Sequence, residues 1–108
     1  MITYNVLIDK DGIYFCCKGH AAHDAKHIDT AGNNLVCAVV SAIAQTCAAG
    51  CGEYANQYNE KACEAGCLEF ICSRNPQTEA ITRAALLGLD EAVRQYPAQV
   101  QRGDVDVD

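Results

Sequence analysis

The apolar residues of this chain change their spacing, from every second residue to every third or fourth. Residues Ile2 to Ile8 alternate, Asp9 to Gly12 supply turn residues, and a second β-branched and aromatic run follows from Ile13 to Lys18. Helical spacing begins after Asn34. Because a strand repeats every two residues and a helix every 3.6, this order predicts a β-hairpin followed by a helix.

The predicted first helix begins behind a residue that suits its start. Asn34 is a good N-cap, and Val36, Val40, Ile43 and Cys47 form one apolar stripe after it. We expect this helix to continue to about Tyr54.

A second hairpin and a second helix follow. Residues 59 to 65 and 67 to 73 are the expected strands around Gly66, and Asn75-Pro76 ends the second of them. Thr78 is the expected N-cap of a helix that stops before Pro97. The tail from Asp104 to Asp108 alternates with valine and is expected to fray.

The order ββαββα predicts an α+β fold of two layers, an α/β sandwich. We expect a mostly antiparallel four-stranded sheet with both helices packed on one face. A chain of 108 residues is the size of one domain, so residues 1–108 are expected to form a single unit.

The formal charge of −6 limits the partners. Fourteen acidic against eight basic residues give the wrong sign for a nucleic-acid backbone, whereas a basic peptide segment is attracted. The chain starts without a signal-peptide pattern, so its eight cysteines are expected to be reduced in the cytoplasm. The apolar stretch from Leu35 to Ala49 is expected to be too short to span a membrane.

Two residues that flank a long patternless loop can carry chemistry together. His20 ends the predicted first hairpin, and Cys37 falls at the third position of the predicted helix, where free N–H groups and the helix dipole favour a thiolate. An imidazole beside it could stabilise the thiolate and protonate an amine leaving group. The same helix-start amides could hold the oxyanion that forms. A buried structural cysteine and a solvated histidine are the alternative.

The residues around this pair resemble a known signature. Gly19-His20-Ala21 is followed, after a variable loop, by the run GNNLVCAVVSAIAQT from Gly32 to Thr46. This pattern resembles that of the ribosomal-processing cysteine protease (Prp) family. Leu86 to Leu89 and Gln95-Tyr96-Pro97 are similar to the family's C-terminal helix and its end.

The resemblance implies a cysteine endopeptidase, usually a homodimer, that removes an N-terminal extension from a bacterial large-subunit ribosomal protein during ribosome assembly. It implies Cys37 as nucleophile and His20 as general base, and no cofactor or metal. Ser41 matches the family's serine, and it could hydrogen-bond in the site or simply let the helix pack closely. The loop residues expected to contact substrate are Ala21, His23 and Gly32.

One position departs from the family pattern. Asn34 stands where the family typically has an acidic residue, and it caps a helix equally well but supplies no charge to a histidine. Asp24 or Asp29 could substitute for that charge. The departure keeps open a non-catalytic assembly factor that binds a ribosomal protein without cleaving it.

The abundance of His and Cys leaves a metal-binding or thiol-redox protein as a third hypothesis. His20, His23 and His27 with Cys37 could bind zinc, although they fall in a loop. A four-thiolate site from Cys47, Cys51, Cys63 and Cys67 lacks the usual two-residue spacing. The favoured interpretation of Cys47, Cys63, Cys67 and Cys72 is that they pack as small apolar residues.

Overall fold

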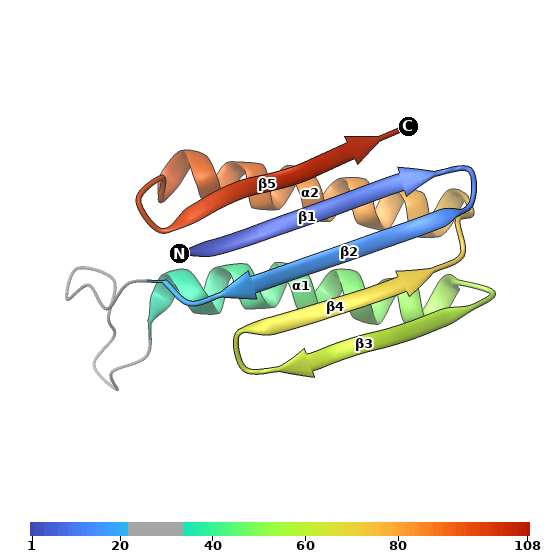
Figure 1. Ribbon diagram of the computed structural model, residues 1–108, viewed down its shortest axis with the longest axis horizontal. Helices are drawn as coiled ribbons and strands as arrows, with labels where there is room; N and C mark the ends of the chain where they lie inside the picture. The colour runs from blue at the N-terminus through green and yellow to red at the C-terminus, as the bar shows by residue number, and fades with distance from the viewer. Residues whose placement is uncertain (22–33) are drawn as a thin grey trace.

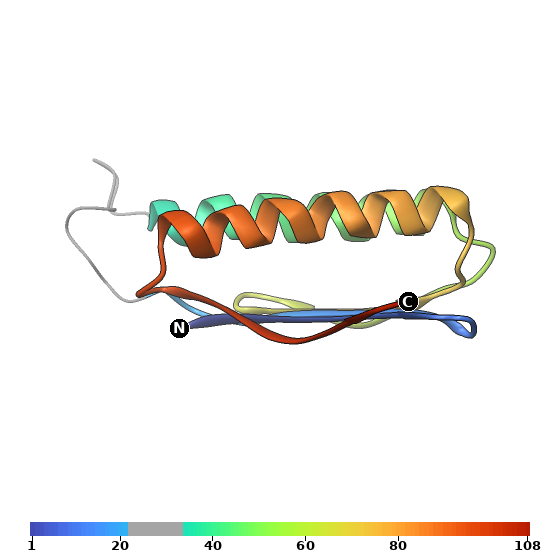
Figure 2. The same cartoon turned by 90° about the horizontal axis from the view of Figure 1, so that it is seen from above.

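The computed structural model describes residues 1–21 and 34–108, and in this part of the chain two helices lie in one layer against a single sheet (Figure 1; Figure 2). The elements are β1 (Ile2–Asp9), β2 (Gly12–Gly19), α1 (Leu35–Tyr54), β3 (Tyr58–Glu64), β4 (Cys67–Cys72), α2 (Pro76–Gln95) and β5 (Val100–Val107). Both helices cover the same face of the sheet, as expected from the order of the elements (Figure 2).

The sheet has five strands in the order β3-β4-β2-β1-β5, so the expectation of four strands is wrong. All neighbours pair antiparallel except β1 and β5, which are parallel because α2 returns the chain to the starting end of β1. The predicted frayed tail is therefore strand β5. Its Val105 and Val107 pack against the core, and the alternating aspartates lie exposed.

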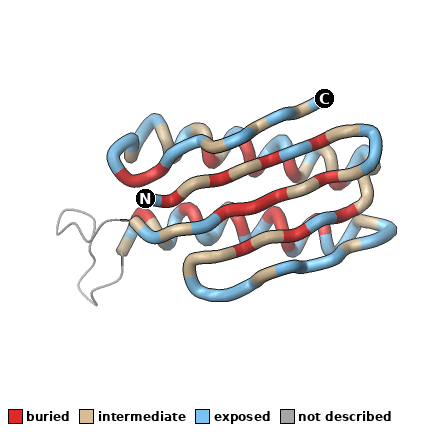
Figure 3. The backbone as a smooth tube through the Cα atoms, in the orientation of Figure 1, coloured by how far each residue is buried: buried red, intermediate tan, exposed pale blue. Residues whose placement is uncertain are grey.

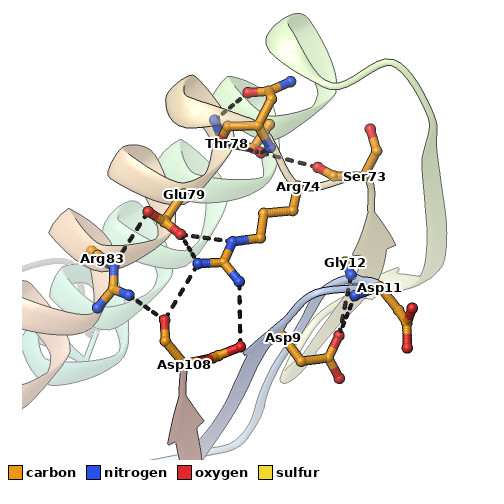
Figure 4. Close-up of polar contacts among 10 residues, drawn as sticks. Asp9, Asp11, Gly12, Ser73, Arg74, Thr78, Glu79, Arg83 and Asp108 are labelled. Atoms are coloured by element: carbon orange, nitrogen blue, oxygen red, sulfur yellow. Dashed lines mark hydrogen bonds and ion pairs between the residues drawn. The ribbon is translucent and has the colours of Figure 1, made fainter.

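The C-terminal end of β5 is fixed to α2 by arginines (Figure 4). The carbonyl oxygen of Asp108 accepts hydrogen bonds from Arg83 Nη2 at 2.7 Å and Arg74 Nη2 at 3.3 Å. The N–H of Asp108 donates to the carbonyl of Ile8 at 2.9 Å. Both the backbone and the charges thus keep the last residues ordered.

The core lies between the sheet and the helices. The central strands β1 and β4 bury alternate residues, β2 does so except that Cys16 is buried as well, and each helix buries one stripe (Figure 3). The apolar side chains that are almost fully enclosed include Tyr4, Val6, Ile8, Ile13, Phe15, Val36, Cys47, Phe70, Leu89 and Val100.

The N-cap of α1 is the residue that the sequence predicts, and the N-cap of α2 is a different one. Asn34 is the N-cap of α1, and its Oδ1 accepts the N–H of Cys37 at 3.0 Å, as predicted. The N-cap of α2 is Asn75, so the prediction of Thr78 is wrong. Thr78 is instead the third helical residue, and it completes a capping box by accepting the N–H of Asn75 at 2.9 Å.

Helix α1 is longer than the apolar stretch that the sequence suggested. The helix has 20 residues, and an 18-residue window of it has a mean hydropathy of 1.8, so by length and composition it could cross a membrane and the prediction that it is too short is wrong. One stripe of the helix is nevertheless part of the core of the sandwich, as in the core helix of a two-layer domain. That stripe comprises Val36, Val40, Ala44, Cys47, Ala48 and Cys51.

Candidate active site

A pocket of about 260 Å³ lies at the end of the sandwich where α1 begins. Its walls come from the start of β1, the end of β2, the first three turns of α1 and the turn between β3 and β4. The residues that line its apolar part are Ile2, Val40, Ala44 and Leu68, and those that line its polar part include Lys18, His20, Cys37, Ser41, Gln45 and Glu64. The pocket therefore contains both residues of the predicted pair.

Cys37 occupies the third position of α1, as the sequence predicts, and is half-buried. Its Sγ accepts a hydrogen bond from the backbone N–H of Ala21 at 3.2 Å. Ala21 belongs to the segment that leaves β2, so the thiol is tied to the chain that carries His20. The Ala21 N–H is therefore a hydrogen-bond donor held beside the sulfur.

The amides at the start of α1 differ from the expected set of oxyanion donors. The N–H of Cys37 is engaged with the Asn34 side chain, and the N–H of Ala38 donates to the Asn34 carbonyl at 3.1 Å. The N–H groups of Leu35 and Val36 are the ones that helix geometry leaves without an intrahelical acceptor. The Ala21 N–H is a further donor beside the sulfur, which the sequence did not indicate.

His20 follows the end of β2, with its side chain exposed at the pocket and its ring against Gly66. Its carbonyl accepts a hydrogen bond from the N-terminal ammonium of Met1 at 2.6 Å. Within the described residues 1–21 and 34–108, no hydrogen bond joins the His20 ring to Cys37 Sγ. The two side chains share one pocket without being in direct polar contact.

The residues predicted to support the site differ in whether they contact the thiol. Ser41 lines the pocket one turn after Cys37, but its hydroxyl accepts a hydrogen bond from Gln45 Nε2 at 2.9 Å. Ala21 contacts the thiol through its backbone. The predicted loop residues His23 and Gly32 lie outside the described residues, as do His27, Asp24 and Asp29.

The cysteines are all free thiols in different surroundings. Burial raises the pKa of Cys17, on the pocket wall, to about 11, so this thiol stays protonated at neutral pH. Cys47 and Cys72 are buried, as the apolar interpretation predicts. Cys63 is exposed and Cys67 half-buried in the β3–β4 hairpin, so this interpretation is wrong for Cys63.

Of the proposed metal sets, only the four-thiolate set lies wholly within the described residues, because His23 and His27 fall outside them. In the described part of the chain, no three His, Cys, Asp or Glu side chains are arranged to hold a metal ion. Cys47 and Cys51 lie buried against Thr82 of α2, where Cys51 Sγ is 3.4 Å from Thr82 Oγ1, whereas Cys63 lies exposed in the β3–β4 hairpin. The four-thiolate site from Cys47, Cys51, Cys63 and Cys67 is therefore not formed among the described residues.

Solved structures share this fold. The S. aureus ribosomal processing protease Prp with a covalently linked product peptide superposes with a TM-score of 0.78 at 18% identity, covering 98% of this chain and 100% of that one. The same S. aureus protease with a substrate peptide gives 0.71 at 19% identity, covering 98% of this chain and 100% of that one. SMU.848 from Streptococcus mutans superposes with a TM-score of 0.72 at 16% identity, covering 100% of this chain and 96% of that one.

The sequence itself carries the family assignment. No curated protein is significantly similar to the chain. The sequence model of the cysteine protease Prp family matches residues 1–101, which is nearly the whole chain and includes every residue of the pocket. The chain therefore belongs to the cysteine protease Prp family and is a cysteine peptidase.

Proposed function

We propose that this peptidase removes an N-terminal extension from a large-subunit ribosomal protein during ribosome assembly, with Cys37 as nucleophile and His20 as general base. The observation that carries the proposal is the thiol at the third position of α1, which accepts the Ala21 N–H inside a pocket shared with His20. The S. aureus structures bind a substrate peptide and a covalently linked product peptide, and they share the fold.

The proposed reaction proceeds in two steps. His20 takes the proton of the Cys37 thiol, and the thiolate attacks the carbonyl carbon of the scissile peptide bond. The C–N bond then breaks, His20 returns the proton to the amine that leaves, and a thioester on Cys37 remains. Water hydrolyses this thioester with His20 again as base, which restores the thiol. The oxyanion of each tetrahedral intermediate is proposed to accept the Ala21 N–H, which is held beside the sulfur.

The His20 ring must approach Cys37 for the first proton transfer. Catalytic hydrogen bonds are often long or missing in the free enzyme and form when substrate binds. The His20 ring lies at the pocket edge against Gly66, and we propose that a bound peptide brings ring and sulfur together while the ring stays on Gly66. We propose that Ala21, His23 and Gly32 contact this peptide, that Ser41 hydrogen-bonds in the site, and that Asn34 fixes the start of α1.

The proposed substrate segment is basic. The chain carries a formal charge of −6, and Glu64 lines the pocket. A negative field attracts a lysine- and arginine-rich peptide and raises the rate of encounter more than the affinity. Free thiols at all eight cysteines fit the proposed cytoplasmic location, where thiols stay reduced.

We further propose that two copies pair through the outer face of α1. This helix has no charged side chain from Leu35 to Gly52, and Leu35 and Val39 are 42% and 40% exposed. Two chains of like charge repel least across an uncharged face, and burying its apolar side chains favours association. Sedimentation should show a dimer that Val39→Glu converts to a monomer.

The cleavage experiment uses peptides that span the N-terminal extension of the host's own ribosomal protein. Wild-type chain should cleave them, Cys37→Ala should abolish cleavage, and His20→Ala should reduce kcat by about 10²- to 10⁴-fold. The matched control is Cys16→Ala, which removes a thiol that does not line the pocket and should leave the rate of the folded variant unchanged.

The same assay tests the alternative function. Tight binding of the peptide without any product would favour a non-catalytic assembly factor. The missing hydrogen bond between His20 and Cys37 and the neutral Asn34 are the observations that keep this candidate open.

A further inference from the structure

We propose that Gly66, in the turn between β3 and β4, is the positioning residue for the His20 imidazole. The inference rests on the proposed function, because it concerns the group that is proposed to move the proton. Gly66 has a φ of +78°, and the His20 ring lies where a Cβ atom on Gly66 would project. A Cβ atom placed on Gly66 would lie 2.5 Å from His20 Cε1 and closer still to Nε2, so a side chain there would require the ring to move.

The backbone on both sides of His20 is fixed as well. The N–H of Gly19 donates to the Gly66 carbonyl at 2.8 Å, which joins the end of β2 to the β3–β4 turn. The N–H of Ala21 donates to Cys37 Sγ at 3.2 Å. The residue before His20 is thus held by the turn, and the residue after it is held by the nucleophile.

These contacts determine where the imidazole can go. His20 is exposed, so solvent alone would allow its ring many positions. Packing against the bare Cα of Gly66 keeps the ring at the pocket edge, and the two backbone bonds set its distance from the sulfur. Proton transfer requires heavy atoms about 2.6–3.2 Å apart, so a displacement of about 1 Å costs on the order of 10²-fold in rate.

The ordinary reason for a glycine here is its positive φ. That reason predicts that Gly66 variants lose stability, whatever stands at position 20. The proposed role predicts instead that the loss of activity depends on the imidazole. Because the atoms that obstruct a Cβ belong to an exposed side chain, alanine at Gly66 should displace the ring and leave the fold intact.

The test is a double-mutant cycle on peptide cleavage. Gly66→Ala should lower kcat by about 10- to 100-fold in the wild-type background. In a His20→Ala background the same substitution should change kcat by less than about twofold, because the ring it displaces is gone. The alkylation rate of Cys37 at neutral pH, followed by mass spectrometry, should show the same dependence on background.

Two further variants control for backbone strain. Gly66→Asn tolerates positive φ but still places a Cβ against the ring, so it should lose kcat like Gly66→Ala while melting closer to wild type. Gly12→Ala changes a glycine of φ +152° at the start of β2, at the far end of the sheet, and it should affect stability but not kcat.

The outcomes separate this inference from the proposed function. Equal losses of kcat from Gly66→Ala in both backgrounds, or unchanged kcat in folded Gly66→Ala and Gly66→Asn, would overturn the positioning role alone. Unchanged kcat in His20→Ala itself would overturn the proposed role of His20, and the role of Gly66 would fall with it.

Discussion

The side chain of Asn34 both caps α1 and contacts the backbone of the proposed nucleophile, Cys37. Its Oδ1 takes the N–H of Cys37 and so begins α1, and the same bond withdraws that N–H from any oxyanion. Asparagine does this without a charge. A carboxylate at this position would place a negative charge close to the thiol, where it would disfavour the thiolate.

The Asn34 substitutions test these two effects separately. Asn34→Ala should lower the free energy of unfolding by about 1 kcal/mol because the N-cap is lost. Asn34→Asp should retain stability within about 0.5 kcal/mol and slow the alkylation of Cys37 at neutral pH, because the added negative charge repels the reactive thiolate. Urea denaturation measures the first effect, and the rate of Cys37 alkylation at neutral pH measures the second. An alkylation rate that does not fall in Asn34→Asp would contradict the second prediction.

Tyr4 predicts how stability depends on alkaline pH. Burial, together with the 2.5 Å hydrogen bond that its hydroxyl donates to Asp90 Oδ1, raises the pKa of Tyr4 above its ordinary value near 10. A raised pKa in the folded state means that the stabilisation is complete below pH ~10 and is lost as pH rises above that value.

Tyr4→Phe should therefore cost about 1–2 kcal/mol at pH 8, and the difference from wild type should shrink at pH 11. Denaturant titrations at the two pH values measure it. The control is Tyr54→Phe at an exposed tyrosine, which should have little effect at either pH. A difference that stays constant with pH would show that the Tyr4 hydroxyl is not linked to stability in this way.

Single-residue patterns predicted part of the site. The N-cap and helical spacing put Cys37 at the third position of α1, and the end of a strand put His20 at the pocket. The contact between His20 and Gly66 could not be predicted, because it joins residues 46 positions apart and a glycine in a hairpin signals only a turn. The Ala21 N–H was missed because backbone donors leave no mark in a sequence.

Among the elements, α2 shows how a helix start can be misplaced by one turn. Asn75 and Thr78 are both of residue types that favour the N-cap. Pro76 suits the first helical position, so the helix begins at Pro76 with Asn75 as its N-cap. Thr78 is fully buried, where its hydroxyl accepts the Asn75 N–H and donates to the Ser73 carbonyl at 3.0 Å.

Thr78→Val should accordingly lower the free energy of unfolding by about 1–2 kcal/mol, because it leaves the partly buried Asn75 N–H and Ser73 carbonyl without this partner. Thr82→Val is the matched control, since Thr82 is equally buried but its hydroxyl contacts the sulfur atoms of Cys47 and Cys51. It should cost less than about 1 kcal/mol, because thiols are weak hydrogen-bonding groups. Thermal or urea melts of the two variants check the contrast, and similar losses in both would refute it.

Strand β5 was missed because its local signals conflict. Alternating valine and aspartate has the period of a strand, but aspartate is depleted in strands and chain ends tend to fray. Its partners are far away in the sequence, since Ile2 pairs with Val100 and the Asn5 side chain accepts the Asp104 N–H at 2.7 Å. The hairpins and helices were predictable because their partners are close in sequence.

For the whole molecule, the formal charge of −6 predicts a salt effect on catalysis. The kcat/KM for a basic extension peptide should fall by about tenfold between 0.05 M and 0.5 M salt, because salt screens the attraction between unlike charges. The control peptide has its lysines replaced by glutamine away from the scissile bond, and it should respond little to salt. Equal responses of the two peptides would argue against a basic substrate segment.

The parallel pairing of β1 with β5 has a consequence for how the enzyme matures. The two strands are separated by nearly the full length of the chain, and closing so long a loop makes their association one of the later events of folding. Ile2 lines the pocket, and its N–H donates to the Gln99 carbonyl at 2.8 Å. The wall of the pocket at Ile2 is therefore complete only after β1 and β5 have paired. We therefore expect peptidase activity to appear only after β5 has paired with β1, although Cys37 and His20 are both synthesised earlier.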